Sequence, residues 1–327
     1  MKWLTLLLVL CVTATNSACA EEARPADIIR ASIQKSVPFI EREGWKWIRT
    51  KKCLSCHMIT FMQWSLHEAE LRGIDVGTDR LAELDEYVQQ QAPQVDPEKK
   101  PKSGDTAAQV VISNLSYESD GRDDLDPWLT NLIRSHKEDG LWGAGGQLPS
   151  QKRPRGETQE VTNYWNLAAL KSTKDVREGF SRIEAKTRER LGAGLASKDS
   201  TPKSTEWFTA RLHLATRSDD KDAIEAARNS LLKLQKEDGG WGWLTESESD
   251  ALATGPAIWV LLQSGMPADS DPVQRAARFL IETQRKDGTW RVESTRARDK
   301  GAVKHTSVYW GTTWAVIGLS QLLPVAE

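Results

Sequence analysis

Apolar and polar residues alternate along the chain with the period of an α-helix, and the helical stretches come in pairs. The segments at 222–235 and 272–284 place apolar residues on one side, which is typical of a helix with one face toward solvent. Each is followed by a more continuously apolar segment, at 250–265 and 305–323, which is typical of a buried helix. The repeating unit is therefore predicted to be an outer amphipathic helix, a loop and an inner helix.

This rhythm extends over the chain and predicts six helix pairs. The outer helices are expected near 27–43, 78–91, 123–136, 174–191, 220–236 and 270–285. The inner helices are expected near 57–72, 105–116, 158–171, 203–216, 250–264 and 305–322. Because no strand pattern interrupts the series, the fold class is predicted to be all-α.

Three loops between paired helices share a motif. They read HKEDGLW (136–142), QKEDGGW (235–241) and QRKDGTW (284–290), and the tryptophans of the last two are 49 residues apart. A spacing near 50 residues is the signature of a repeat architecture. In each copy the glycine suits the left-handed residue that closes a helix, and the tryptophan is expected to fold back on the last helical turn.

These loops resemble the Q-x-x-x-G-x-W signature of the squalene–hopene cyclase and prenyltransferase repeat family. Residues 235–241 and 284–290 match it fully, and His136 replaces the glutamine in the third copy. The resemblance covers most of residues 27–323 and implies an α/α toroid of about six helix pairs around a central cavity. That fold implies no activity by itself, because such toroids serve cyclases, protein prenyltransferases and binding domains alike.

The acid that class II triterpene cyclases of this family use is absent. Their D-x-D-D-T-A motif resembles DALAT at 250–254, where Leu252 stands at the position of the proton donor. Leucine cannot protonate an alkene, so a functional cyclase is not expected, and Asp250 is predicted to cap the inner helix instead. A zinc-dependent prenyltransferase is not expected either, because the chain shows no spread set of Asp, Cys and His ligands.

Composition adds two observations. The chain has 14 Trp against 5 Phe and 4 Tyr, and several of these tryptophans fall near the middle of predicted inner helices, at Trp64, Trp165, Trp259 and Trp314. The formal net charge is −2, which argues against a nucleic-acid partner.

The N-terminal segment 1–20 has the composition of a secretory signal peptide. Lys2 precedes an apolar run, and Ala18 and Ala20 frame an A-x-A cleavage site, so a single mature domain is expected over 21–327, in the periplasm or otherwise exported. The alternative is lipidation at Cys19, which would associate the chain with a membrane. No later segment is long and apolar enough for a membrane helix.

Residues 53–57 read CLSCH and hold the only two cysteines beyond that signal. This sequence is the attachment motif of haem c: Cys53 and Cys56 would form thioethers with the two vinyl groups, and His57 would bind the iron. A thioredoxin-type redox pair and a zinc site are the alternatives. One covalent haem c is the favoured interpretation, because haem attachment occurs outside the cytoplasm and no other mature cysteine competes.

The haem motif lies in the first pair, where the loop motif would be expected. The outer helix is predicted to end at FIEREGW (39–45), which would place Trp45 and Trp47 in the loop, either covering a porphyrin face or packing the loop. Three basic residues in the same turn are candidates for pairing with haem propionates or for docking a partner, namely Arg49, Lys51 and Lys52.

The second axial ligand is not identified by any motif. His305 begins the last inner helix, and in a closed ring that helix lies beside the first, so His57 and His305 are expected at one rim. His305 is therefore the candidate distal ligand, with a cavity-lining role and a five-coordinate or water-bound iron as alternatives.

Taken together, the sequence predicts an exported single-haem c-type protein on a squalene-cyclase-like toroid. Its expected role is electron transfer to a redox partner protein, or haem-based redox chemistry on a small apolar ligand in the cavity. A degenerate terpenoid cyclase or other isoprenoid enzyme, and a non-catalytic haem-bearing binding or sensor module, are the alternatives.

Overall fold

The computed structural model describes residues 24–326 apart from short stretches at 55–57, 95, 97, 99–100, 102–103, 117–123, 146–147, 174–178, 194–200 and 219. The predicted signal segment 1–20 lies outside the described residues, as do Cys56 and His57. No described helix is long and apolar enough to cross a membrane.

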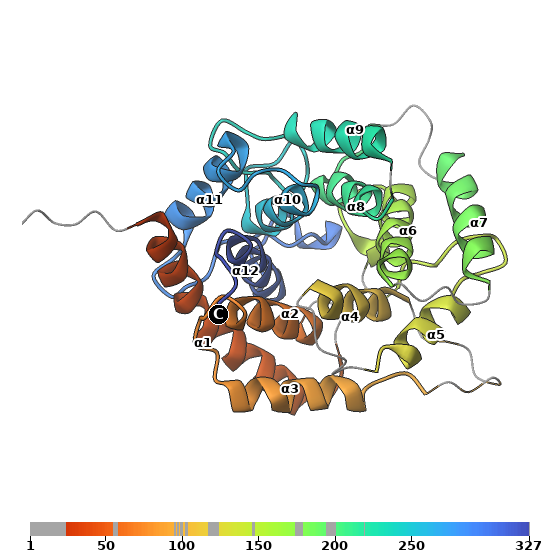
Figure 1. Cartoon of the computed structure of the whole chain (residues 1–327), viewed down its shortest axis with the longest axis horizontal. Helices are drawn as coiled ribbons and strands as arrows, with labels where there is room; N and C mark the ends of the chain where they lie inside the picture. The colour runs from red at the N-terminus through yellow and green to blue at the C-terminus, as the bar shows by residue number, and fades with distance from the viewer. Residues whose placement is uncertain are drawn as a thin grey trace, which may run out of the picture.

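Twelve α-helices form an inner and an outer ring in the described part of the chain (Figure 1). The outer ring consists of α1 (Pro25–Lys51), α3 (Thr78–Gln90), α5 (Asp126–Arg134), α7 (Phe180–Gly192), α9 (Lys221–Leu232) and α11 (Asp271–Thr283). The inner ring consists of α2 (Ile59–Glu70), α4 (Gly104–Ser116), α6 (Arg155–Ser172), α8 (Thr205–Thr216), α10 (Ala251–Gln263) and α12 (His305–Ser320). Two short 3₁₀ turns, Leu148–Ser150 and Ala297–Asp299, lie in loops that join the rings. The predicted α/α toroid of six pairs is confirmed.

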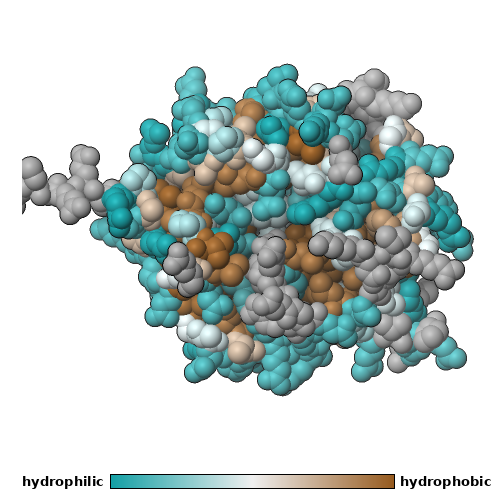
Figure 2. Space-filling view, in the orientation of Figure 1, coloured by the Kyte–Doolittle hydropathy of each residue, from teal (hydrophilic) through white to brown (hydrophobic). Residues whose placement is uncertain are grey.

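The inner ring is closed. Each inner helix packs against the next in chain order, and α12 packs against α2. The inner helices are buried on nearly all sides, with every residue of α2 from Ile59 to Ala69 buried, whereas the outer helices bury one face. On the face in Figure 2, apolar residues gather inside a largely hydrophilic margin.

The loop motif ties each outer helix to its own loop. The indole N–H of Trp142, Trp241 and Trp290 donates to the carbonyl ten residues earlier, over 2.7, 2.9 and 2.8 Å. The preceding glycines have φ values of 81–87°, in the left-handed region that only glycine adopts at little cost. The predicted fold-back of the tryptophan is therefore confirmed in all three copies.

In the three motif copies, the first residue ties its outer helix to the next one. Gln235 Nε2 donates to the carbonyl of Pro272 in α11 over 2.8 Å, and Gln284 Nε2 donates to the carbonyl of Ser32 in α1 over 2.9 Å. His136 Nε2 lies 3.0 Å from Thr187 Oγ1 in α7, so in this copy the histidine makes the contact to the next outer helix that glutamine makes in the other two. The Gln284 contact joins the last outer helix to the first and closes the outer ring.

Helix α1 departs from the sequence prediction. It runs to Lys51 rather than ending near residue 43, so Trp45, Trp47 and Arg49 are helical and not in a loop. Gly44 lies inside this helix. A Cβ there would lie 2.2 Å from Met62 Sδ, so this glycine allows α1 to approach α2 closely and does not stop the helix.

Candidate functional site

Four tryptophans from four inner helices meet at the centre of the ring. Trp64 packs against Trp259 and Trp314 with ring centroids 5.3 and 5.1 Å apart, and Trp165 lies 6.2 Å from Trp259. They come from α2, α10, α12 and α6, at the mid-helix positions noted in the sequence. This cluster accounts for four of the 14 tryptophans, because wide planar side chains fill the middle of a ring that six helices cannot close by themselves.

A cavity of about 110 Å³ lies against this cluster. Its walls come from the N-terminal halves of inner helices, including Phe61 of α2, Glu206 of α8, Leu252 of α10 and Thr306 of α12. The cavity therefore lies toward the end of the ring at which the inner helices begin.

Two loops meet over this end of the ring. Residues 148–153 precede α6, and residues 294–296 precede α12. The N–H of Lys152 donates to the carbonyl of Thr295 over 2.8 Å, and Gln151 and Arg296 form an isolated antiparallel bridge. The two loops hold each other across the ring and both line the cavity.

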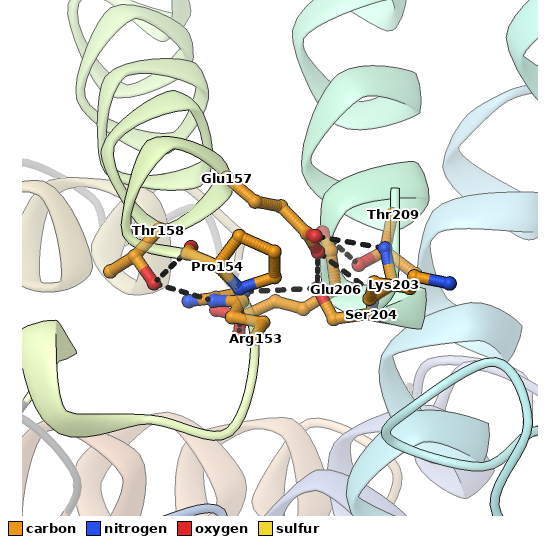
Figure 3. Close-up of polar contacts among 8 residues, drawn as sticks. All are labelled: Arg153, Pro154, Glu157, Thr158, Lys203, Ser204, Glu206 and Thr209. Atoms are coloured by element: carbon orange, nitrogen blue, oxygen red, sulfur yellow. Dashed lines mark hydrogen bonds and ion pairs between the residues drawn. The ribbon is translucent and has the colours of Figure 1, made fainter. Parts of the chain in front are cut away.

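Arg153 anchors one of these loops (Figure 3). Its Nη1 donates to Glu206 Oε2 over 2.8 Å and to Ser204 Oγ over 3.2 Å, and its Nε donates to Thr158 Oγ1 over 3.2 Å. The guanidinium also lies over the Trp243 ring, 5.5 Å from its centroid. Because the arginine is buried and paired with a carboxylate, it fixes the cavity wall while leaving that wall electrically neutral.

Glu157 fixes the α6–α8 side of the same wall. Its carboxylate accepts hydrogen bonds from the backbone N–H groups of Lys203 and Ser204, both over 2.8 Å, and from the Ser204 hydroxyl (Figure 3). A buried carboxylate with three donors is well satisfied. Its role is therefore to hold the start of α8 against α6.

Asp250 caps α10 as predicted. Its carboxylate accepts from the N–H groups of Ala253 and Trp243, each over 2.9 Å. Burial raises the pKa of this carboxyl to about 6, although the two backbone donors act in the opposite direction. Leu252, two residues on, lines the cavity, so the position that resembles the cyclase acid faces the cavity with an apolar side chain.

Cys53 lies immediately beyond α1. Lys52 closes that helix in the left-handed conformation, and Cys53 is exposed with a free thiol. The next described residue after this segment is Met58, which is buried immediately before α2. Phe61, one helical turn later, lines the cavity. The C-x-x-C-H segment therefore joins α1 to the inner helix that walls the cavity.

The surroundings of this segment contain buried polar atoms that fit an additional group. Trp45 Nε1 on α1 and the Tyr87 hydroxyl on α3 have no hydrogen-bond partner in the described part of the chain. Burial, and secondarily the Cys53 thiol, raises the pKa of Tyr87, which places its ring near that thiol. An exposed thiol with a nearby hydroxyl that lacks a partner in the described residues is compatible with a covalent haem, whose edge carries polar groups. Trp45 itself lies under the Arg80 guanidinium, 5.2 Å from its centre, in helix–helix packing.

His305 is the first residue of α12, as predicted. Its Nε2 lies 3.1 Å from Glu43 Oε2, and its ring packs against Phe39 with centroids 6.0 Å apart. Helices α2 and α12 are in contact, and Phe61 lies 6.0 Å from Trp310, so the first and last pairs are neighbours. The structure does not describe His57, and iron binding by His305 stays a prediction.

Sequence reasoning missed most of the polar cavity wall. Gln151, Arg153 and Arg296 lie in loops without a motif, and they converge only when the ring closes. Thr162 and Asn166 could have been noticed, because they recur four residues apart on an inner helix that is otherwise buried. The described residues contain no group of three or more His, Cys, Asp or Glu side chains that could hold a metal ion.

Comparison with known proteins agrees with part of this description. Residues 203–298 match the family described as squalene-hopene cyclase C-terminal domain. A drimenyl diphosphate synthase of Streptomyces showdoensis is 33% identical over 75 residues, which is 23% of this chain and 14% of that protein. This alignment thus spans about a seventh of that curated relative. The family match covers α8–α11 with their motif loops.

The whole chain resembles solved α/α toroids at low identity. An unsaturated glucuronyl hydrolase from Bacillus sp. GL1 has a TM-score of 0.62 and 15% identity, with 90% of this chain and 96% of that chain covered. A glycosyl hydrolase family 88 protein from Bacteroides vulgatus has a TM-score of 0.58 and 11% identity, with 91% and 99% covered. At such identity the likeness shows the fold alone.

Proposed function

We propose that this chain is an exported single-haem c-type protein that carries its haem at one end of an α/α toroid. It would serve electron transfer, or redox chemistry on a small ligand held in the central cavity. The observation that carries the proposal is the C-x-x-C-H segment between α1 and α2. Cys53 is exposed at the end of α1, and the residues that follow the motif lead directly into the cavity wall.

The chain's own residues have separate parts in this proposal. Cys53 and Cys56 would hold the haem through thioethers, and His57 would bind the iron; when bound, the haem would supply one-electron oxidation and reduction. Arg49, Lys51 and Lys52 are exposed beside Cys53, which suits an acidic docking surface on a redox partner.

His305 is the candidate second ligand in this proposal. Its Nε2 now faces Glu43 Oε2 at 3.1 Å, so binding iron would require the ring to leave that carboxylate. Replacing His305 with alanine should change the spectrum of the oxidised haem and leave covalent attachment intact. An unchanged spectrum would restrict His305 to its contact with Glu43.

Covalent haem is tested by expressing the full chain in a host that matures c-type cytochromes. Haem staining on a denaturing gel and a pyridine haemochrome spectrum should show one haem on the polypeptide. The double variant Cys53→Ala, Cys56→Ala should remove the stain, whereas Cys19→Ser should keep it. Wild-type chain that stays colourless in that host would overturn the proposal. The Cys19→Ser control also shows whether membrane association depends on that cysteine.

The similarity to cyclases favours a second candidate, an isoprenoid enzyme on the same toroid. Leu252 at the cavity wall offers no proton, which disfavours alkene protonation there. Incubation of purified protein with squalene separates the two readings: unchanged squalene is expected, and a cyclised product would support the enzyme.

A further inference from the structure

One wall of the central cavity carries buried polar atoms that have no partner. Gln151 Oε1, Thr162 Oγ1 and both amide atoms of Asn166 lack a hydrogen bond in the described part of the chain, and all three residues line the cavity. They are 8%, 3% and 1% exposed. Leaving buried polar groups without partners is costly, so a cavity with such a wall indicates an occupant.

Much of the remaining lining is aromatic. Trp310 and Trp314 of α12, Phe61 and Trp64 of α2, and Trp165 of α6 all line the cavity. In the closed ring α12 lies opposite α6, which carries Thr162 and Asn166 (Figure 1). An occupant should therefore be polar along one edge and apolar over the rest of its surface. A monosaccharide carries hydroxyl groups around its whole rim, which is more than one polar edge can pair.

The charges of the lining favour a neutral occupant. Two acidic residues, Asp105 and Glu206, are balanced by two basic ones, Arg153 and Arg296, and Arg153 pairs directly with Glu206. Among the described residues, the buried polar atoms without partners include the amide donor and acceptor of Asn166, an acceptor on Gln151 and the Nε donor of Arg296. A hydroxyl group both donates and accepts, so it matches this mixture better than a carbonyl or an ammonium group.

The volume of the cavity, about 110 Å³, suits a small occupant. An enclosed apolar protein cavity of roughly 150 Å³ holds benzene, so this cavity takes about one small ring, and a fifteen-carbon chain would leave most of its carbon outside it. Aromatic walls also favour a flat ring, which can lie against the face or edge of tryptophan.

We infer that the cavity binds a neutral aromatic ring with hydroxyl groups on one edge, that is, a phenol or catechol. The hydroxyl edge faces Gln151, Thr162 and Asn166, and the ring lies against the tryptophans of α12 and α2. This inference rests on the proposed function only in placing a small ligand in the cavity. Ligand binding is measured without reference to haem colour or turnover, so the ligand inference and the haem proposal can fail independently.

The test is calorimetric titration of the mature full chain with catechol, benzene, glucose and farnesol. Catechol should bind saturably with one site per chain. Benzene should bind at least tenfold more weakly, because it leaves the polar wall without partners. Glucose and farnesol should not bind. Tighter binding of glucose or farnesol than of catechol would overturn the inference, and so would the absence of saturable catechol binding, which would leave the cavity to water.

Variants locate the site. Asn166→Leu should weaken catechol binding about tenfold, since it removes a donor and an acceptor worth about 1.4 kcal/mol together. Ala108→Leu places an isobutyl group in the cavity wall and should abolish binding. The matched control is Gln89→Met on α3, whose Nε2 is also buried without a partner in the described residues but lies outside the cavity lining. Wild-type affinity in Asn166→Leu and Ala108→Leu, or equal losses in Gln89→Met, would refute the site.

Discussion

Replacing Gln284 with leucine should loosen the ring at the point where its last outer helix meets its first. Gln284 Nε2 donates to the Ser32 carbonyl, the Ser36 hydroxyl and the Gly288 carbonyl over 2.9, 3.0 and 3.2 Å. Its Oε1 accepts from the Ser32 hydroxyl over 3.1 Å. Leucine has a similar volume and removes all of these hydrogen bonds, while α11 and its loop keep their own backbone contacts.

The expected loss follows from the number of these hydrogen bonds. One amide has two donor hydrogens and an acceptor oxygen, so about three net bonds are lost at about 1 kcal/mol each, or about 3 kcal/mol in the free energy of unfolding. Gln235→Leu should cost about 2 kcal/mol, because Gln235 makes two such bonds, to Gly239 and Pro272, both over 2.8 Å.

Urea unfolding followed by tryptophan fluorescence measures these differences. Gln274→Leu is the control on the same helix, since Gln274 makes one exposed hydrogen bond within its own segment and should cost about 0.5 kcal/mol or less. If Gln284→Leu destabilised the chain no more than Gln274→Leu, the contact between α11 and α1 would not hold the ring closed, and the reasoning would be wrong.

Three further changes test other parts of the fold by the same unfolding measurement. His213 is fully buried, and burial lowers its pKa well below 6.5, so the unfolded chain takes up the proton first as the pH falls. The free energy of unfolding should therefore fall by about 1 kcal/mol between neutral pH and pH 5.5. His213→Leu should lack this loss, and an identical pH profile would contradict the assignment. The pKa of Asp250 is raised to about 6 in the folded state, so between about pH 4 and 6 the folded chain binds a proton that the unfolded chain does not. The contribution of Asp250 to the free energy of unfolding should therefore fall by about 3 kcal/mol as the pH rises through that window. Asp250→Asn should flatten the stability profile there, and an unchanged slope would exclude the raised pKa. Gly288→Ala should lower the free energy of unfolding more than Gly265→Ala. Both glycines have φ near 80°, but a Cβ at Gly288 would lie 2.1 Å from the Lys35 carbonyl oxygen, whereas Gly265 has open space around it. Equal losses would mean that backbone strain alone decides the effect.

Much of the architecture could be predicted from local features. The outer helices show one apolar face, whereas the inner helices α10 and α12 are apolar around most of their circumference, so the hydrophobic pattern separates these pairs without any knowledge of contacts. The ends of the motif helices were also predictable, because a left-handed glycine and a tryptophan that returns to the last turn act within ten residues. The N-cap role of Asp250 is of the same local kind.

The end of α1 could not be predicted in this way. Gly44 favours a helix end by its intrinsic propensity, but it lies where a side chain would collide with Met62 and Tyr309. The gain from close packing of α1 on α2 and α12 exceeds the propensity cost of one glycine, and that gain depends on residues distant in the sequence. For the same reason Trp45 belongs to a helix interface and not to a loop.

The sequence by itself determined the number and order of the helices, the loop motifs and the C-x-x-C-H segment, because each depends on neighbours within a few turns. Only the tertiary structure decided what fills the ring and what faces its cavity. Trp64, Trp259 and Trp314 lie far apart in the chain and meet only when α12 packs against α2 and α10. Likewise Gln151 and Arg296 carry no signal alone, and they become one polar wall because two loops pair across the mouth of a closed ring.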